Sequence, residues 1–314
     1  MVNDNHSLQD NEETIHRYWD NNLDPVLTIE SGDVVNFKCP EPTWGAVTPD
    51  TVAEDLYNIS TPGHALLGPV EIADAEPGDV LQIDLLSVNH GDWGFTIVNP
   101  GKMNDGLLPE RFEEPEIYIW DLSEGVGEFV NGIEVPLDPF PGVVGLAPST
   151  DGRHSTSPPR NVGGNLDVKH LTEGSTVYLP VEVTGGLFSI GDGHAAQGDG
   201  EVCITAIETA LSVTVGFELR SDMDIDQPQF ETNSPFTPTG RDESMYCTTG
   251  ISDDLMDAAK QAVSAMIDHL CGEYSLSSHE AYILCSVAVD LKVNELVNAP
   301  NWVVSAYLPK SILP

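Results

Sequence analysis

The segment ADAEPGDVLQIDL, residues 73–85, places acidic residues and a Gly turn directly before an alternation of apolar and polar residues. This order predicts a tight turn that leads into a β-strand. The same order occurs in LTIESGDVVNF, residues 27–37, and in LTEGSTVYLPVEV, residues 171–183. Three such units predict a mainly β protein with a barrel-like or sandwich-like core.

Turn-forming residues interrupt the chain at short intervals as far as about residue 250. The sequence holds 28 Gly and 23 Pro, which predicts many short strands joined by Gly-rich loops. Residues 91–156 are rich in Gly, Pro and acids, and we expect an irregular excursion there, with strands at 116–120 and 132–136. The pattern does not predict the topology of this excursion.

Beyond residue 250 the pattern becomes helical. Ser252 precedes apolar residues that recur at intervals of three and four, and Gly272 follows them, which predicts a capped helix. Ser277 with Glu280 has capping-box spacing and predicts a second helix. The segment NWVVSAY, residues 301–307, predicts a closing strand. The fold class is therefore α+β, mainly β, with a β core over 1–250 and a C-terminal helical pair and strand over 251–314 integral to the same fold.

The charge balance excludes several classes of partner. The 314 residues carry 12 Lys and Arg against 51 Asp and Glu, a net charge of −39. Nucleic acids and anionic membranes both attract clustered cations, so neither is expected as a partner. Acids spread along the whole chain with few Lys predict a halophilic protein adapted to high salt.

Cysteine usage and the N-terminus predict a cytoplasmic protein. The five Cys occur singly, without a C-x-x-C pair, so neither a disulfide framework nor a thiolate zinc site is expected. The opening MVNDNHSLQDNEE has no basic stretch and no apolar core, unlike a secretory signal. The longest apolar run, residues 281–289, is far shorter than the roughly 18 residues of a membrane span.

Residues 158–208 hold the densest run of reactive side chains, in PPRNVGGNLDVKHL (158–171) and GGLFSIGDGHAAQGDGEVCITAIE (185–208). Polar residues interleaved with Gly suit a site built on loops between strands. Asp192, His194 and Glu201, joined by Asp167, form a possible divalent-metal set, since such sites combine imidazole and carboxylates. An alternative remains open: the acids are only turn residues, and the imidazole of His194 is hydrogen-bonded to backbone groups.

The sequence gives weaker signals for other kinds of catalytic site. Cys285 is a possible nucleophile, although a Cys in an apolar helical stretch is more often a core residue. The nucleophile-elbow, Walker and Rossmann patterns are absent. His64 and His16 are further candidates for the rim of the site, whereas Tyr18 and Trp19 suggest packing.

The quoted strings resemble the acetamidase/formamidase family, together with GPVEIADAEPGDVLQIDL (68–85), TTGISDDLMDAAKQAVSAMIDHL (248–270) and AYILCSVAVDLKVNELVN (281–298). The resemblance runs from HRYWDNNLDP onward and covers nearly the whole chain. It implies a cytoplasmic homo-oligomer of β-rich fold that hydrolyses formamide, acetamide or a similar small amide, with zinc or calcium as the metal. The family pattern points to Asn165, Asp167, Asp192, His194, Asp199 and Glu201.

One segment departs from the family pattern. Before LLGPVEI this chain has ISTPGHA, residues 59–65, where many family members carry N-P-x-T-G-P. The wall of the pocket formed by this segment, and with it the identity of the amide, is therefore not predicted.

The resemblance leads to a specific hypothesis for the site. Asp167, Asp192 and His194 hold a divalent cation, and Glu201 takes a proton from water and returns it to the leaving nitrogen. Asn165, or a backbone N–H of the Gly cluster, stabilises the oxyanion. The remaining member of the expected catalytic set is Asp199.

Two alternatives to this hypothesis stay open. In the first, the chain is a non-catalytic β protein that binds a small molecule or a metal. In the second, it is a metal-independent amidase that uses Cys285.

Overall fold

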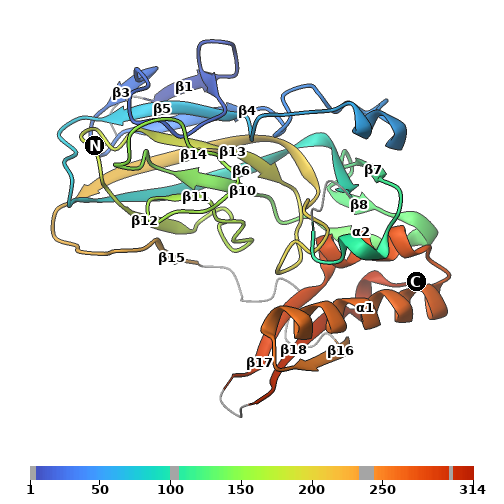
Figure 1. Ribbon diagram of the computed structural model, residues 1–314. Helices are drawn as coiled ribbons and strands as arrows, with labels where there is room; N and C mark the ends of the chain where they lie inside the picture. Colours follow the sequence, from blue (N-terminus) through green and yellow to red (C-terminus); the bar gives the residue numbers. More distant parts are fainter. Residues whose placement is uncertain (1–4, 100–105, 233–243, 297–299) are drawn as a thin grey trace.

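The computed structural model describes residues 5–99, 106–232, 244–296 and 300–314. The fold is mainly β, with two α-helices near the C-terminus (Figure 1). Most of the described strands form one 13-stranded sheet: β1 (Asn5–Gln9), β2 (Ile15–His16), β3 (Leu27–Ile29), β4 (Val34–Cys39), β5 (Leu66–Ile72), β6 (Val80–Val98), β7 (Glu116–Asp121), β10 (Phe140–Gly145), β11 (Gly163–Asn165), β12 (Thr176–Pro180), β13 (Phe188–His194), β14 (Glu208–Arg220) and β15 (Gln229–Glu231).

The remaining elements are shorter or lie near the C-terminus. They are β8 (Val126–Glu128), β9 (Glu134–Pro136), β16 (Met245–Ser252), β17 (Asp290–Glu295), β18 (Trp302–Pro309), the helices α1 (Leu255–Tyr274) and α2 (Ser278–Ala288), and the 3₁₀ helices η1 (Ala53–Tyr57), η3 (Pro109–Arg111), η4 (Val130–Gly132) and η5 (Lys310–Ile312).

The large sheet branches and does not close. β13 pairs with β5, β10 and β14, whereas the longest path runs from β11 to β15 and leaves both ends open within the described residues. The expectation of a barrel is therefore not confirmed, while that of an α+β, mainly β fold is. Phe37, Phe188 and Phe217 pack edge to face in the apolar core of this sheet.

The repeated turn-and-strand units are confirmed. Their turns end at Gly32, Gly78 and Gly174, and each unit leads into a strand, β4, β6 or β12. Gly32 and Gly78 have φ of 99° and 103°, a backbone region that residues with a side chain rarely adopt. Because the turn and the alternation that follows it are both local features, sequence alone predicts these units.

Strand β6 corrects the expected start of the irregular excursion. It continues through residue 91 to Val98, because β14 on one side and β7 on the other pair with its backbone. Gly94 permits the close approach of β14, since a Cβ there would lie 2.6 Å from the Glu208 carbonyl oxygen. The two strands expected within the excursion are confirmed as β7 and β9, and residues 100–105 lie outside the described residues.

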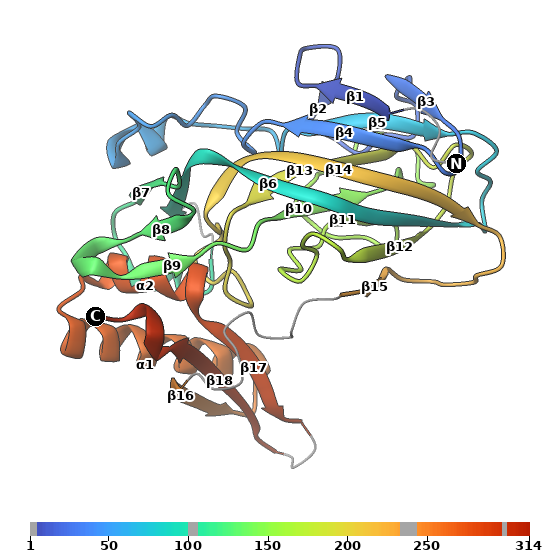
Figure 2. The ribbon, with the colours of Figure 1, turned by 180° about the vertical axis from the view of Figure 1, so that it is seen from behind.

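The elements β16, α1, α2, β17 and β18 form what we call the C-terminal unit, which has a sheet of its own beside the large sheet. Strands β16, β18 and β17 form a three-stranded sheet, and α1 packs against it (Figure 2). Ala281 and Tyr282 of α2 belong to the same apolar cluster as Trp120 of β7 and Ile207. The apolar core therefore continues from the β region into the helical pair.

Both predicted helices are present, with changed bounds for the first. Its N-cap is Asp254 rather than Ser252, because the Asp254 side chain accepts the hydrogen bond from the Asp257 N–H. Gly272 lies inside α1, whose C-cap is Ser275 in the left-handed region. The capping box of Ser277 and Glu280 is confirmed at the start of α2.

The closing strand is confirmed as β18. Within the described residues, neither α-helix is long and apolar enough to cross a membrane.

Candidate active site

Two adjacent strands of the large sheet supply the buried centre of the site. Asp192 and His194 are two residues apart on β13, and their side chains meet although Asp192 is in the left-handed region with φ of 58°. Glu208, the first residue of β14, lies directly opposite His194 in the antiparallel register. All three side chains are buried.

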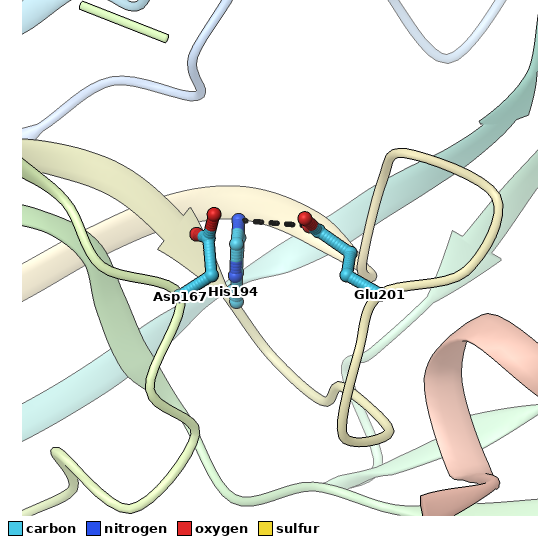
Figure 3. A group of neighbouring side chains, drawn as sticks. All are labelled: Asp167, His194 and Glu201. Carbon is cyan, nitrogen blue, oxygen red and sulfur yellow. Dashed lines mark ion pairs between the residues drawn. The ribbon is translucent and has the colours of Figure 1, made fainter. Parts of the chain in front are cut away.

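His194 Nε2 is surrounded by carboxylate oxygens. It lies 3.2 Å from Glu208 Oε2, 3.7 Å from Asp192 Oδ2 and 3.8 Å from Glu201 Oε1. Asp167 and Glu201 stand on opposite sides of the imidazole ring (Figure 3). Negative carboxylates gathered this closely around one nitrogen inside a protein would repel one another. A cation or a proton must therefore lie between them.

Gln197 fixes the orientation of His194. Its Nε2 donates to the backbone oxygen of Asp167 at 2.9 Å, so its Oε1 is the atom that faces His194 Nδ1, also at 2.9 Å. The His194 Nδ1–H therefore donates to Gln197, an assignment made from the hydrogen-bond network. Burial lowers the pKa of His194, but Glu208 and Asp192 outweigh it and raise that pKa well above its usual range, so without a metal Nε2 carries a proton as well. A cation that replaced this proton would bind the lone pair of Nε2, with Nδ1–H still held by Gln197.

Loops bring the other two carboxylates. Asp167 follows β11, and its backbone N–H donates to the Gly142 carbonyl at 3.2 Å. Glu201 lies on the loop between β13 and β14. Both residues are in the left-handed region, with φ of 47° and 41°. Such conformations persist where the surrounding structure holds them, and they are concentrated at functional sites.

Burial changes the proton affinity of these groups. It raises the pKa of Asp167 to about 7 and the pKa of Glu201 well above its usual range, and the neighbouring carboxylates add to both effects. Burial also raises the pKa of Glu208, against the effect of His194. For Asp192, burial acts upward as well, but the His64 and His194 imidazoles outweigh it and lower its pKa to about 2.

A cavity of about 350 Å³ opens above these carboxylates. Asn165, Asp167, Asp192, Glu201 and Glu208 line its polar side. Its apolar side is lined by Pro42, Phe95, Ile97 and Ile204. The cavity therefore offers a ligand both carboxylates and apolar side chains.

Gly142 on β10 leaves the space in which the acids converge. A Cβ at this position would lie 2.7 Å from Asp167 Oδ1, 2.9 Å from Asp192 Oδ2 and 2.8 Å from His194 Cε1. Any side chain would therefore fill the space between the three groups. The absence of a side chain here is required by the site and not by a turn.

The structure brings together most of the predicted site residues. Asn165, Asp167, Asp192 and Glu201 line the cavity, and His194 lies among the acids. His64, expected at the rim, lines the cavity too, and its Nε2 lies 4.0 Å from Asp192 Oδ2.

Asp199 is not brought to the cavity. Its carboxylate lies 3.7 Å from Lys169 Nζ, and it is not among the lining residues. Its catalytic role stays a prediction.

The surroundings of His16, Trp19 and Cys285 indicate that these residues support the fold. His16 Nε2 is hydrogen-bonded to Ser189 Oγ at 2.8 Å, and Trp19 is buried in a small apolar cluster, in agreement with packing. Cys285 is fully buried in the apolar core around α2, where burial raises the pKa of its thiol far above the usual range. A reactive thiolate requires the opposite shift.

Two important residues were not predicted. Glu208 was missed because strand alternation, counted back from the buried Leu211 and Val213, places it on the outer face. A β-bulge between Thr209 and Leu211 reverses that phase. Gln197 stands in the polar string itself, and a sequence signal for it would have been its spacing of three from His194.

The donor set fits a metal. Asp167, His194 and Glu201 form one group whose ligand atoms lie within 4.8 Å of one another, and Asp192, His194 and Glu208 form a second. Asp167 Oδ1 is buried without a hydrogen bond, and so are Glu208 Oε2 and Asn165 Oδ1. The unpaired oxygens of Asp167 and Glu208 belong to these two groups, and buried acceptors without a donor favour a bound cation.

Comparison with known proteins gives a consistent match. The model of the Acetamidase/Formamidase family matches residues 1–154 and 150–314. The chain is 29% identical to a formamidase of Methylophilus methylotrophus over 95% of this chain and 89% of that protein. It is 26% identical to an acetamidase of Mycolicibacterium smegmatis, over 78% of this chain and 75% of that one.

Solved structures agree. A gamma lactamase from Delftia acidovorans superposes with a TM-score of 0.90 at 27% identity, covering 98% of this chain and 93% of that one. An acetamidase from Bacillus halodurans superposes with a TM-score of 0.68 at 31% identity, covering 97% of each chain.

Proposed function

Because the chain belongs to the acetamidase/formamidase family, we propose that it hydrolyses short linear amides to a carboxylate and ammonia in the cavity beside His194. In this reaction water adds to the carbonyl carbon, the C–N bond breaks, and the leaving nitrogen gains a proton. The observation that carries the proposal is the set of carboxylates around His194 Nε2 on the polar side of that cavity.

A divalent cation fits the strand-borne group best. Asp192, His194 and Glu208 are all buried and lie on paired strands, and a cation there would replace the proton on His194 Nε2. We therefore place the metal on these three residues, with Glu208 in the role that the sequence suggested for Asp167. An imidazole ligand favours zinc over calcium, since calcium takes oxygen ligands. A bound divalent ion would supply Lewis acidity, which polarises a carbonyl and lowers the pKa of water.

Glu201 is suited to move the proton. It lies 3.8 Å from His194 Nε2 and lines the cavity, and burial raises its pKa well above its usual range. A carboxylate with a raised pKa is a stronger base than an exposed one, so it can accept a proton from water and later give it to the leaving nitrogen. Without that second transfer the leaving group would be an amide anion.

Asn165 is placed to bind the developing oxyanion. It lines the cavity on β11, beside the carboxylates. Its amide can donate one N–H to the substrate oxygen. Loss of one such donor in other enzymes costs roughly 3 to 4 kcal/mol of transition-state stabilisation.

The experiment is ammonia release from formamide, acetamide and propionamide, in high and low salt, before and after chelation with metal added back. Loss of activity on chelation and its return with zinc supports the metal-assisted reaction. Activity that survives complete metal removal would contradict it, and Cys285→Ala would then test the thiol alternative. Folded protein that releases no ammonia from any amide would favour a binding protein instead.

A larger or cyclic amide is a second candidate substrate. The cavity of about 350 Å³ is within the range of sites for drug-sized ligands, about 300–1,000 Å³, whereas acetamide is far smaller. Phe95, Ile97 and Ile204 give it an apolar wall, and the structural neighbour with a TM-score of 0.90 is a gamma lactamase. A higher kcat/KM for a γ-lactam than for acetamide would select this substrate class.

A further inference from the structure

Asp290, the first residue of β17, joins the C-terminal unit to both loops of the site. Its Oδ1 forms an ion pair with Lys169 Nζ and accepts a hydrogen bond from the Asp199 backbone N–H at 3.2 Å. The side chains of Lys169 and Asp290 are only 10% and 11% exposed. Lys169 Nζ also lies 3.7 Å from Asp199 Oδ1, so the three residues form one cluster.

The cluster lies close in sequence to the two loop-borne carboxylates. Lys169 is two residues beyond Asp167, and Asp199 is two residues before Glu201. Asp290 itself is not among the residues that line the cavity. It therefore contacts neither the substrate space nor the acids directly, but it holds the chain segment beside each of the two.

Backbone contacts strengthen the connection on the Glu201 side. The Gly198 N–H donates to the Ser286 carbonyl at 2.8 Å, and the Leu291 N–H donates to the Asp199 carbonyl at 3.1 Å. A Cβ at Gly198 would lie 2.2 Å from the Val289 carbonyl oxygen. The loop that carries Glu201 thus lies directly against the junction of α2 and β17.

These contacts act on residues whose own backbone does not favour the observed conformation. Asp167 and Glu201 are both in the left-handed region, where a residue with a side chain needs support from its surroundings. Asp167 and Glu201 lie on opposite sides of His194 (Figure 3). A shift of either loop would change the gap between them, in which the water and the amide must meet.

We propose that Asp290 is a positioning residue for the reaction: through Lys169 and the Asp199 N–H it sets the separation of Asp167 and Glu201 across His194. The inference rests on the proposed amide hydrolysis. It also gives Asp199 a part in the site, as the link between Asp290 and the Glu201 loop.

The test uses three variants of the full chain and one matched control. Asp290→Asn removes the charge that pairs with Lys169 but keeps an oxygen for the Asp199 N–H. Lys169→Met removes the cation, and the double variant completes a mutant cycle. The control is Asp268→Asn, the same substitution in the same C-terminal unit, where Asp268 pairs with Arg111 and is 70% exposed.

Two readouts separate positioning from general stability. For Asp290→Asn, kcat on the preferred amide should fall on the order of 10- to 100-fold, as for other residues that orient a site through a neighbour, while KM changes little. Hydrogen exchange should accelerate in residues 166–171 and 197–203. In the Lys169→Met background, Asp290→Asn should cause little further loss of kcat and little further acceleration of exchange. Asp268→Asn should leave kcat and exchange in both loops unchanged.

Wild-type kcat and wild-type exchange in a folded Asp290→Asn variant would overturn the inference. So would equal losses for Asp290→Asn and Asp268→Asn, since the effect would then be one of stability. If Asp290→Asn does not fold, Lys169→Met carries the same test with the same expected results. A wild-type protein without amidase activity would refute the proposed function, and the exchange measurements would still decide whether Asp290 holds the two loops.

Discussion

The two halves of the site differ in what holds them. Asp192, His194 and Glu208 project from the paired strands β13 and β14, where ladder pairing fixes the backbone of His194 and Glu208, while Asp192 is in the left-handed region with φ of 58°. Asp167 and Glu201 come from loops, in left-handed conformations that contacts with other segments must maintain. The strand half suits a task that needs fixed geometry, such as holding a cation, and the loop half suits proton transfer.

The largest effect is expected in the loop half. Glu201→Gln keeps the shape of the side chain but removes the carboxylate that takes the proton. We expect kcat to fall by about 10²- to 10⁴-fold, the usual contribution of a general acid–base residue. Metal content, measured by atomic emission on the same preparation, should stay at the wild-type level. Unchanged turnover would remove Glu201 from this role and with it the division of tasks.

The pH dependence of stability should also distinguish the halves in metal-free protein. Burial raises the pKa of Asp167 from 3.8 to about 7. The folded state thus keeps a proton that the unfolded chain loses first, so the free energy of unfolding should decrease by a few kcal/mol as pH rises from about 4 to 7. Urea unfolding across this range, in the presence of a chelator, measures it.

The controls for this pH dependence are Asp167→Asn, which should flatten the decrease, and added zinc, which should cancel it. Asp192 behaves in the opposite sense, since His64 and His194 outweigh its burial and lower its pKa to about 2. Its stabilising contribution is present above the unfolded pKa of 3.8 and is lost as pH falls toward 2. Equal slopes for wild type and Asp167→Asn would show that Asp167 does not titrate in this way.

A smaller effect is expected from Glu208→Gln in the strand half. Removing this carboxylate should weaken zinc affinity by at least as much as the loss of an outer-shell partner, about 10- to 100-fold. Excess zinc should then restore much of the activity, which it should not do for Glu201→Gln. A Glu208→Gln variant that binds zinc as tightly as wild type would place the metal on the loop-borne group instead.

Two glycine substitutions give the smallest effects and opposite signs. Gly142→Ala would place a Cβ within 2.9 Å of Asp167 Oδ1 and Asp192 Oδ2. It should lower the free energy of unfolding by about 1–3 kcal/mol and impair zinc binding. Gly272→Ala in α1 has open space around its Cβ, and it should raise stability by about 0.5–1 kcal/mol. Thermal unfolding of both variants measures these two changes in stability. A stabilising Gly142→Ala would show that the space between the acids is not needed.

Several elements could be predicted because neighbouring residues specify them. The Gly turns before β4 and β6 and the capping box before α2 are local, and each was recognised from a few consecutive residues. The continuation of β6 to Val98 was missed, because its Gly residues suggest a loop until a partner strand is known to lie against them.

The mainly β pattern, the helical pair and the Gly-rich strings that contain Asp167, Asp192, His194 and Glu201 can all be recognised in the sequence. Backbone propensity and side-chain alternation depend on residues close along the chain, so both are legible without a structure. The tertiary structure alone decided that Glu208 faces His194, that Asp199 turns away toward Lys169, and that Asp290 holds both loops. Strand register, a β-bulge and contacts across about 90 to 120 residues set these positions, and no local pattern specifies them.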